Sequence, residues 1–173
     1  SSVALVQTLH PASTTTAWTS ANVSNLGAHP VMTETASSTV NPYFLHVIFP
    51  GTPGSGNPPA LQRTAITNGT AATLTWPDGH VDTILWRHGA GDVTYDGLTS
   101  DARLTIVRRF GSVPAGLVAI EGRSIVDQSQ ELLTVYDGSA PVTVTAFGGT
   151  VAVDGTDASR IRIGLPSITT AHI

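Results

Sequence analysis

From Ala60 onward, Asn-Gly and Asp-Gly dipeptides divide the sequence into short segments. These dipeptides are favoured in β-hairpin turns, where successive residues need positive φ angles. The segments between them are rich in β-branched and aromatic residues and recur about every ten residues, as short strands do. The dipeptides lie at 68–69, 78–79, 96–97, 137–138 and 154–155. The pattern predicts antiparallel strands joined by tight turns.

The alternation of side chains along these segments supports the same interpretation. In residues 141–147, Val142, Val144 and Ala146 are expected to face one way and the threonines between them the other. Residues 92–123 are expected to form three strands around one Asp-Gly turn and one glycine-containing loop. No convincing helical period occurs. We therefore expect an all-β, two-sheet antiparallel β-sandwich, jelly-roll-like, with roughly a dozen strands and little or no helix.

The N-terminal third is less regular. Residues 3–9 are expected to form a strand, and residues 11–27 a polar loop with at most one short outer strand. The apolar run at 43–49 is expected to be a strand buried on both faces. Proline and glycine exclude regular structure from 51–60, which is expected to be a long loop inside one domain spanning 1–173.

Composition excludes several functional classes. The net charge is −4, and the eight basic residues are all arginine and scattered, so we expect neither a nucleic-acid nor a membrane partner. The absence of cysteine excludes disulfides, thiol catalysis and cysteine-bound metals. No apolar run approaches the roughly 20 residues that span a bilayer. Ser1 is expected to be a mature or excised terminus.

One pattern suggests a metal site. His80 and Asp82 lie two residues apart and so on one face of a strand, with His88 as a possible third ligand. The simpler interpretation is the polar face of a hairpin that begins at Asp78-Gly79, because a closed zinc site needs more ligands.

Calcium is a second possibility, with oxygen ligands from aspartates in turns. The same aspartates are explained by local hydrogen bonding to the backbone of the turns, and no EF-hand pattern is present. No cofactor is therefore required, and a structural zinc or calcium ion remains an option. The aspartates concerned are Asp92, Asp96 and Asp101, or Asp154 and Asp157.

Aromatic residues are few, and two are candidates for contact with sugar rings. Exposed Trp18 or Tyr95 would offer an aromatic face to a glycan. Trp76 and Trp86 close strands of a hairpin and are expected to pack in the core or at an edge.

The sequence predicts no catalytic residue. The GxSxG, P-loop and dinucleotide-binding patterns are absent. His46 lies within an apolar run and has no neighbouring nucleophile or carboxylate in the sequence, so a role as a base is not supported.

Several segments together resemble a known family. YDGLTSDARLTIVRR, EGRSIVD, LLTVYDGSAPVTVTAFGGTVAV and RIRIGLP are similar to the C-terminal β-sandwich region of heparinase II/III-like polysaccharide lyases, and FLHVIFPG resembles a strand that precedes a long loop there. The resemblance covers most of the chain from about Tyr43 onward and consists of turn and strand motifs.

The resemblance implies an extracellular or periplasmic β-sandwich that follows an α/α-toroid catalytic domain in enzymes that cleave acidic polysaccharides by β-elimination. The catalytic Tyr and His of the family come largely from the helical domain, so none is carried over to this chain. Some members hold a structural zinc, for which His80, Asp82 and His88 are the only candidates here, without a motif that maps them.

Three functions follow as expectations. The first is a non-catalytic β-sandwich domain of a carbohydrate-active enzyme that supports its catalytic domain or contacts polysaccharide or oligosaccharide. The second is a free-standing carbohydrate-binding module, and the third is a structural or assembly sandwich of the capsid-like or cell-surface kind. An independent small enzyme would rest only on His46 and the His80/Asp82 pair.

Overall fold

The computed structural model describes residues 3–10, 14–23, 27–36, 45–51, 58–136, 140–155 and 160–166. It divides into two compact units, Ser1–Gly56 and Asn57–Ile173, which are described separately. The prediction of one domain across 1–173 stays a prediction, and residues 52–57 of the proline- and glycine-rich loop lie outside the described residues.

The first unit contains two antiparallel strand pairs. β1 (Val3–His10) pairs with β4 (Leu45–Gly51), and β2 (Thr14–Val23) pairs along its whole length with β3 (Gly27–Ala36). The loop predicted over 11–27 is therefore wrong for most of its length, because regular pairing with β3 outweighs the weak local pattern of β2.

The burial predicted for the strand at 43–49 is also wrong. Ile48 on β4 is 60% exposed, and its described neighbours at 45, 46, 47 and 49 are only half-buried. Among the described strands β4 pairs with β1 alone, and a two-stranded sheet has no second layer of its own to cover both faces.

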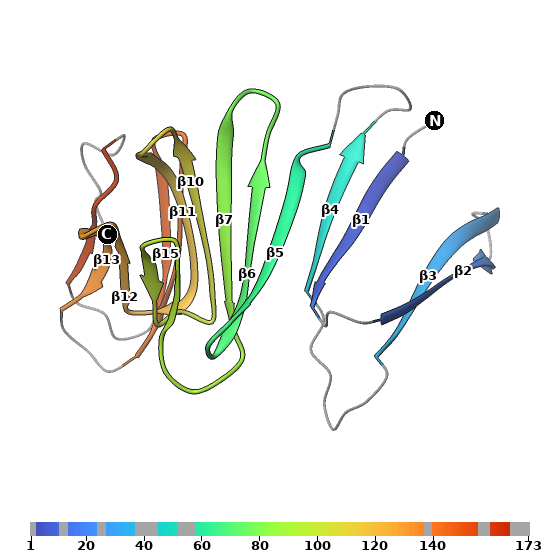
Figure 1. Ribbon diagram of the computed structural model, residues 1–173, viewed down its shortest axis with the longest axis horizontal. Coiled ribbons are helices and arrows are strands. Elements are labelled where there is room, and N and C mark those ends of the chain that lie inside the picture. The colour runs from blue at the N-terminus through green and yellow to red at the C-terminus, as the bar shows by residue number, and fades with distance from the viewer. Residues whose placement is uncertain are drawn as a thin grey trace. The chain divides into compact units, whose positions relative to one another are not determined.

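The second unit consists of two antiparallel sheets (Figure 1). The seven-stranded sheet contains, in chain order, β5 (Ala60–Ile66), β6 (Gly69–Thr75), β7 (His80–Arg87), β10 (Leu104–Phe110), β11 (Val113–Gly122), β14 (Val142–Phe147) and β15 (Thr150–Asp154). The five-stranded sheet contains β8 (Val93–Tyr95), β9 (Leu98–Ser100), β12 (Ser124–Asp127), β13 (Gln130–Val135) and β16 (Ile161–Ile163). The predicted all-β, two-sheet antiparallel sandwich is confirmed, and the described residues include no helix.

Within each sheet the strands follow one another in chain order, and the chain passes repeatedly from one sheet to the other. The turn at Asp96-Gly97 has the expected positive φ angles, 49° and 77°, and joins β8 to β9. The chain then crosses at Ser100–Arg103 into β10. Residues 92–123 therefore hold four strands instead of the three expected, because the second expected strand is broken by this crossing.

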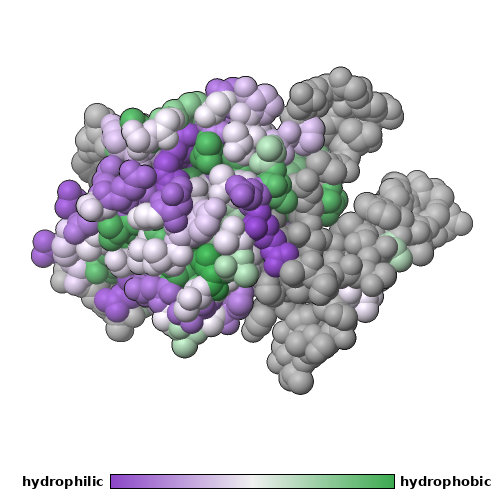
Figure 2. Space-filling view, viewed as in Figure 1, coloured by the Kyte–Doolittle hydropathy of each residue, from purple (hydrophilic) through white to green (hydrophobic). Residues whose placement is uncertain are grey.

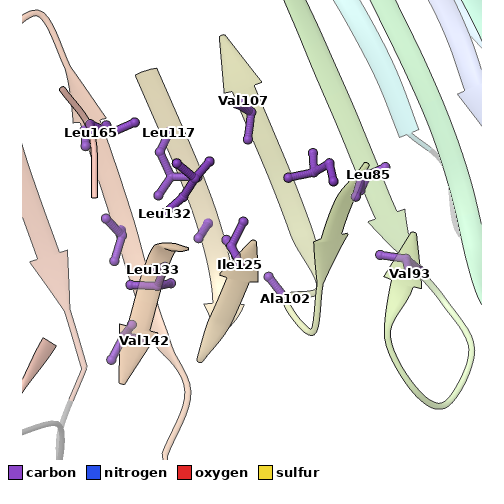
Figure 3. Packing of buried hydrophobic residues seen from close by; sticks show 14 of the residues in the cluster. Leu85, Val93, Ala102, Val107, Leu117, Ile125, Leu132, Leu133, Val142 and Leu165 are labelled. Carbon is purple, nitrogen blue, oxygen red and sulfur yellow. The ribbon is translucent and has the colours of Figure 1, made fainter. Parts of the chain in front are cut away.

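The core lies between the two sheets. Figure 3 shows side chains from both sheets, among them Val107 and Leu117 from one and Ile125 and Leu132 from the other, gathered in this space. The predicted inward residues Val142, Val144 and Ala146 are buried, which confirms that alternation. The full cluster is Ala71, Leu85, Val93, Leu98, Ala102, Val107, Leu117, Ala119, Ile125, Leu132, Leu133, Val135, Val142, Val144, Ala146 and Leu165.

The seven-stranded sheet also has an outer face, which carries the side chains that alternate with the core residues. Leu85 of β7 faces the core, so its neighbours Ile84 and Trp86 belong to the outer face, as do His80 and Asp82. Figure 2 shows hydrophilic residues spread over the visible side of the second unit, with smaller apolar areas among them. The candidate site lies on the outer face of the seven-stranded sheet, at the end where the turn between β6 and β7 lies.

Candidate functional site

A tight turn between β6 and β7 begins the site. The backbone N–H of Gly79 donates to the carbonyl oxygen of Trp76 at 2.9 Å, and the N–H of Trp76 donates to the carbonyl oxygen of His80 at 3.0 Å. Pro77 has the fixed φ that suits the second position of such a turn, and Gly79 takes a φ of 87°. The predicted hairpin at Asp78-Gly79 is confirmed, and it places Trp76 and His80 side by side.

The register between β7 and β10 adds residues from the next strand. Phe110 lies opposite His80, and Arg108 lies opposite Asp82. Facing positions on one side of an antiparallel pair have side chains in contact. We call the resulting group the His80 cluster, which consists of Trp76, Asp78, His80, Asp82, Arg108 and Phe110.

The imidazole of His80 lies at the centre of the cluster. It stacks on the ring of Trp76, with centroids 5.1 Å apart and planes 23° apart, and the ring of Phe110 lies 5.5 Å away on a tilt. Its side chain is only 9% exposed. Nδ1 lies 2.5 Å from Asp78 Oδ1 and Nε2 lies 3.9 Å from Asp82 Oδ2, but neither contact has the directional geometry of a hydrogen bond.

The carboxylate of Asp82 is buried and fully engaged. Nε and Nη2 of Arg108 donate to its two oxygens at 2.8 and 2.9 Å, and Nε1 of Trp76 donates to Oδ2 at 2.8 Å. The hydrogen bonds to this carboxylate raise the pKa of Arg108 above its ordinary value. Arg108 also lies 5.3 Å from the centroid of the Phe147 ring, within range of a cation–π contact.

Two groups of the cluster face solvent. The side chain of Asp78 is 61% exposed and Phe110 is 53% exposed. The contact with the His80 side chain lowers the pKa of Asp78, so this carboxylate is ionised at neutral pH. The cluster therefore exposes an aromatic ring, Phe110, and a hydrogen-bond acceptor, Asp78, and both contact the buried side chain of His80.

The three residues nominated as metal ligands do not form one site. His80 and Asp82 lie together, whereas His88 follows the far end of β7, about 26 Å away along an extended strand. There Nε2 of His88 lies 3.5 Å from the hydroxyl of Thr70. No group of three or more metal-ligating side chains occurs among the residues that the structure describes. Asp82 is also a poor ligand because Arg108 and Trp76 occupy its oxygens.

Of the aspartates considered for calcium, Asp96 and Asp101 have roles in a turn and a crossing, and Asp92 is exposed just before β8. Asp101 Oδ1 accepts hydrogen bonds from the backbone N–H groups of Arg123 and Ser124 at 2.8 and 2.9 Å. Asp96 forms a turn with a positive φ. Asp154 is exposed at the end of β15, and Asp157 lies outside the described residues. This arrangement fits the alternative explanation by turn chemistry.

The two residues nominated for sugar contact are not in the His80 cluster. Tyr95, on β8 in the other sheet, is half-buried and packs against the core. Trp18 lies on β2 opposite Met32, and its side chain is outside what the structure describes. His46, considered as a base, lies half-buried on β4 opposite Thr8.

Sequence reasoning did not nominate Phe110, Arg108 or Asp78 for this site. Phe110 alternates with Arg109 and Arg108 at the end of a strand, so its face could be predicted but its neighbours could not. The signal that could have found the cluster is the sequence Trp-Pro-Asp-Gly-His at 76–80, which combines two rings with a turn known to hold its flanking residues together.

Comparison of the chain with family models, curated proteins and solved structures finds no match. The fold therefore defines the class, an all-β antiparallel sandwich. In the part of the chain that the structure describes, no helix has the length and apolar character needed to cross a membrane.

Proposed function

We propose that this chain is a non-catalytic β-sandwich domain of a carbohydrate-active enzyme of the polysaccharide-lyase type, and that it contacts glycan through the His80 cluster. The observation that carries the proposal is the half-exposed ring of Phe110, which lies against the ring of His80. His80 in turn stacks on Trp76 and contacts the exposed, ionised carboxylate of Asp78. Aromatic faces pack on the apolar faces of sugar rings, and a carboxylate accepts hydrogen bonds from sugar hydroxyls.

The chemistry of the cluster favours binding over catalysis. A general base must come within hydrogen-bond reach of the proton that it removes. Both nitrogens of His80 are buried, and Asp82 is held by Arg108 and Trp76, so neither group is presented to a substrate. Asp78 is exposed and ionised, which suits an acceptor of hydrogen bonds.

The sequence resemblance supplies the wider setting of this proposal. It implies a position beside an α/α-toroid catalytic domain or chain in an extracellular or periplasmic enzyme. The encoding reading frame tests this part: helical repeats immediately upstream of Ser1 would support it. A frame without such a domain would leave the free-standing carbohydrate-binding module in its place.

Glycan contact is tested with the 173-residue chain by affinity electrophoresis and by a glycan array that includes neutral and acidic polysaccharides. We expect retardation by at least one polysaccharide. The variant Phe110→Ala removes the aromatic face and should weaken binding about tenfold, as expected for loss of an aromatic stacking contact. Because Phe110 is exposed, the unfolding midpoint of the Phe110→Ala variant should differ little from that of the unmodified chain.

Tyr136→Ala is the matched control. Tyr136 is also an aromatic residue, 49% exposed, but it follows β13 in the other sheet and lies against Arg160. It should leave binding unchanged. If no glycan retards the unmodified chain, contact with glycan is abandoned, and the role of supporting a catalytic domain is what remains.

The assembly alternative is favoured by one observation, the edge strand β15. Its residues alternate between half-buried and exposed, and its only charged residue is Asp154 at its end. Strand edges with few charges can pair with a second chain. Light scattering at rising concentration tests this alternative, because a persistent monomer would count against assembly.

A further inference from the structure

The charge of the His80 cluster restricts the kind of glycan that it can hold. Asp78 and Asp82 supply two carboxylates, and Arg108 supplies one guanidinium, which is paired with Asp82. Asp78, whose side chain is 61% exposed, is the carboxylate of the cluster that Arg108 does not bind. A ligand on this cluster would therefore meet an exposed carboxylate that is not engaged by the guanidinium of Arg108.

Among the residues that the structure describes, the cation of the outer face that acts on Asp78 is Arg108, and its guanidinium is bound to Asp82. Arg109, the neighbour of Arg108, points to the core side and is paired with Asp127. Arg63 on β5 lies two strands away from β7 and in register with Ile84, which places it about 16 Å from His80. That separation exceeds the screening length of about 8 Å at physiological ionic strength.

The hydrogen-bonding groups of the cluster lead to the same conclusion. Carboxylates and sulfates on a sugar are acceptors and need donors. The indole N–H of Trp76 and two donor nitrogens of Arg108 are directed at Asp82, and the nitrogens of His80 are buried. Asp78, which is exposed, accepts hydrogen bonds and so needs a ligand that donates them, as sugar hydroxyls do.

We propose that the His80 cluster binds neutral glycan, whose sugars carry hydroxyl groups and no carboxylate or sulfate. The inference rests on the proposed function, since it names the ligand class of the same site. It separates the binding preference of this surface from the acidic polysaccharides that the resembled lyases cleave. The domain would hold a neutral chain while another domain acts on an acidic one.

The test uses two matched pairs of polymers that differ chiefly in charge. They are hydroxyethyl cellulose against carboxymethyl cellulose, and fully methyl-esterified against de-esterified polygalacturonate. Affinity electrophoresis of the full chain at pH 7 should show binding to a neutral member at least about fivefold tighter than to its acidic partner, as one like charge at close range would cause. Repeating the measurement at high salt screens the general repulsion due to the net charge of −4.

Asp78→Asn is the decisive variant, because it removes the charge and keeps the shape. Asp78→Asn should reduce the ratio of the affinity for the neutral polymer to the affinity for its acidic partner. Phe110→Ala should instead weaken binding to the neutral polymer. Stronger binding to the acidic members, or an unchanged preference in Asp78→Asn, overturns the ligand class while the glycan contact stands. Binding to neither member of either pair, nor to any glycan on the array, overturns the proposed function together with this inference.

Discussion

Arg109 and Asp127 form a buried, two-point ion pair between the two sheets of the sandwich. Nε and Nη2 of Arg109 on β10 donate to the carboxylate of Asp127 on β12 at 2.8 and 2.7 Å. Nη1 of Arg109 donates to the hydroxyl of Thr83 at 2.8 Å, so the guanidinium also joins two strands of its own sheet. Both charged side chains are more than nine-tenths buried. The pair therefore fixes the position of one sheet on the other.

Replacing Asp127 by Asn should destabilise the second unit strongly. The change removes the negative charge and leaves the guanidinium of Arg109 buried without its counter-ion. Breaking a buried pair in this way costs about 3–5 kcal/mol of unfolding free energy. Urea denaturation followed by tryptophan fluorescence measures the loss.

An exposed ion pair provides the control for this prediction. Arg103 and Glu121 lie 3.1 Å apart with both side chains more than half exposed, and Glu121→Gln should cost about 0–1 kcal/mol. The double variant Arg109→Met with Asp127→Leu should lose less stability than Asp127→Asn, because it leaves no buried charge. Equal losses in Asp127→Asn and Glu121→Gln would contradict the importance of burial here.

Asp101 should stabilise the places where the chain crosses between the sheets. Its Oδ1 accepts the backbone N–H groups of Arg123 and Ser124, and its own N–H donates to the carbonyl oxygen of Ser124 at 3.2 Å. Asp101→Ala removes the two side-chain bonds and should lower the unfolding free energy by about 1–3 kcal/mol. Urea midpoints measure the change.

Asp92 offers a comparison for Asp101, because it is an exposed aspartate at the start of β8. Asp92→Ala should change the unfolding free energy, measured by urea denaturation, by no more than about 0.5 kcal/mol, as surface substitutions usually do. If both variants lose the same amount, the crossing does not depend on the carboxylate of Asp101.

The sequence predicted the sandwich but not its topology, that is, which strands belong to which of the two sheets. The turns at 68–69, 78–79 and 96–97 and the alternation at Val142, Val144 and Ala146 report local geometry, and they were confirmed. The dipeptide at 137–138 lies outside the described residues, and the turn expected at 154–155 stays a prediction. A period of two says which residues share a face, but it does not say in which of two sheets the strand lies. The crossing at Ser100–Arg103 was missed for that reason.

The candidate site was only partly visible in the sequence. His80 and Asp82 were singled out because they are two residues apart. The partner of Asp82 is Arg108, 26 residues further along the chain, and only the register of β7 with β10 brings them together. Without that register Asp82 looked like a free ligand, although its oxygens are occupied.

The pair of Arg108 and Asp82 should depend on the shape of the guanidinium as well as on its charge. Arg108→Lys keeps a cation but cannot bind both carboxylate oxygens in the same way, and should cost about 1 kcal/mol. Arg108→Met leaves Asp82 buried without a cation. It should cost about 2–3 kcal/mol, less than at Asp127, because the side chain of Arg108 is 32% exposed.

Urea denaturation measures both Arg108 variants, and the indole N–H resonances give an independent check. The resonance of Trp76 should move in Arg108→Met, because its hydrogen bond ends on the affected carboxylate. The resonance of Trp86, further along β7, should stay in place. Equal stability of the Lys and Met variants would contradict a role for the charge.

Asp78 should make the stability of the second unit depend on acid pH. Its pKa is lowered from the ordinary 3.8, chiefly by the contact with the His80 side chain. A group whose pKa is depressed on folding contributes stability above its unfolded pKa and loses it as the pH falls through its folded pKa. The excess stability of the unmodified chain over Asp78→Asn should thus be constant from about pH 5 to 7 and shrink below about pH 4.

An NMR titration of the Asp78 carboxyl should give a pKa below 3.8, and His80→Phe, which keeps a ring on Trp76, should return the pKa of Asp78 toward that value. If stability curves of the unmodified chain and Asp78→Asn run parallel down to acid pH, or if His80→Phe leaves the Asp78 titration unchanged, the coupling of these two side chains is refuted.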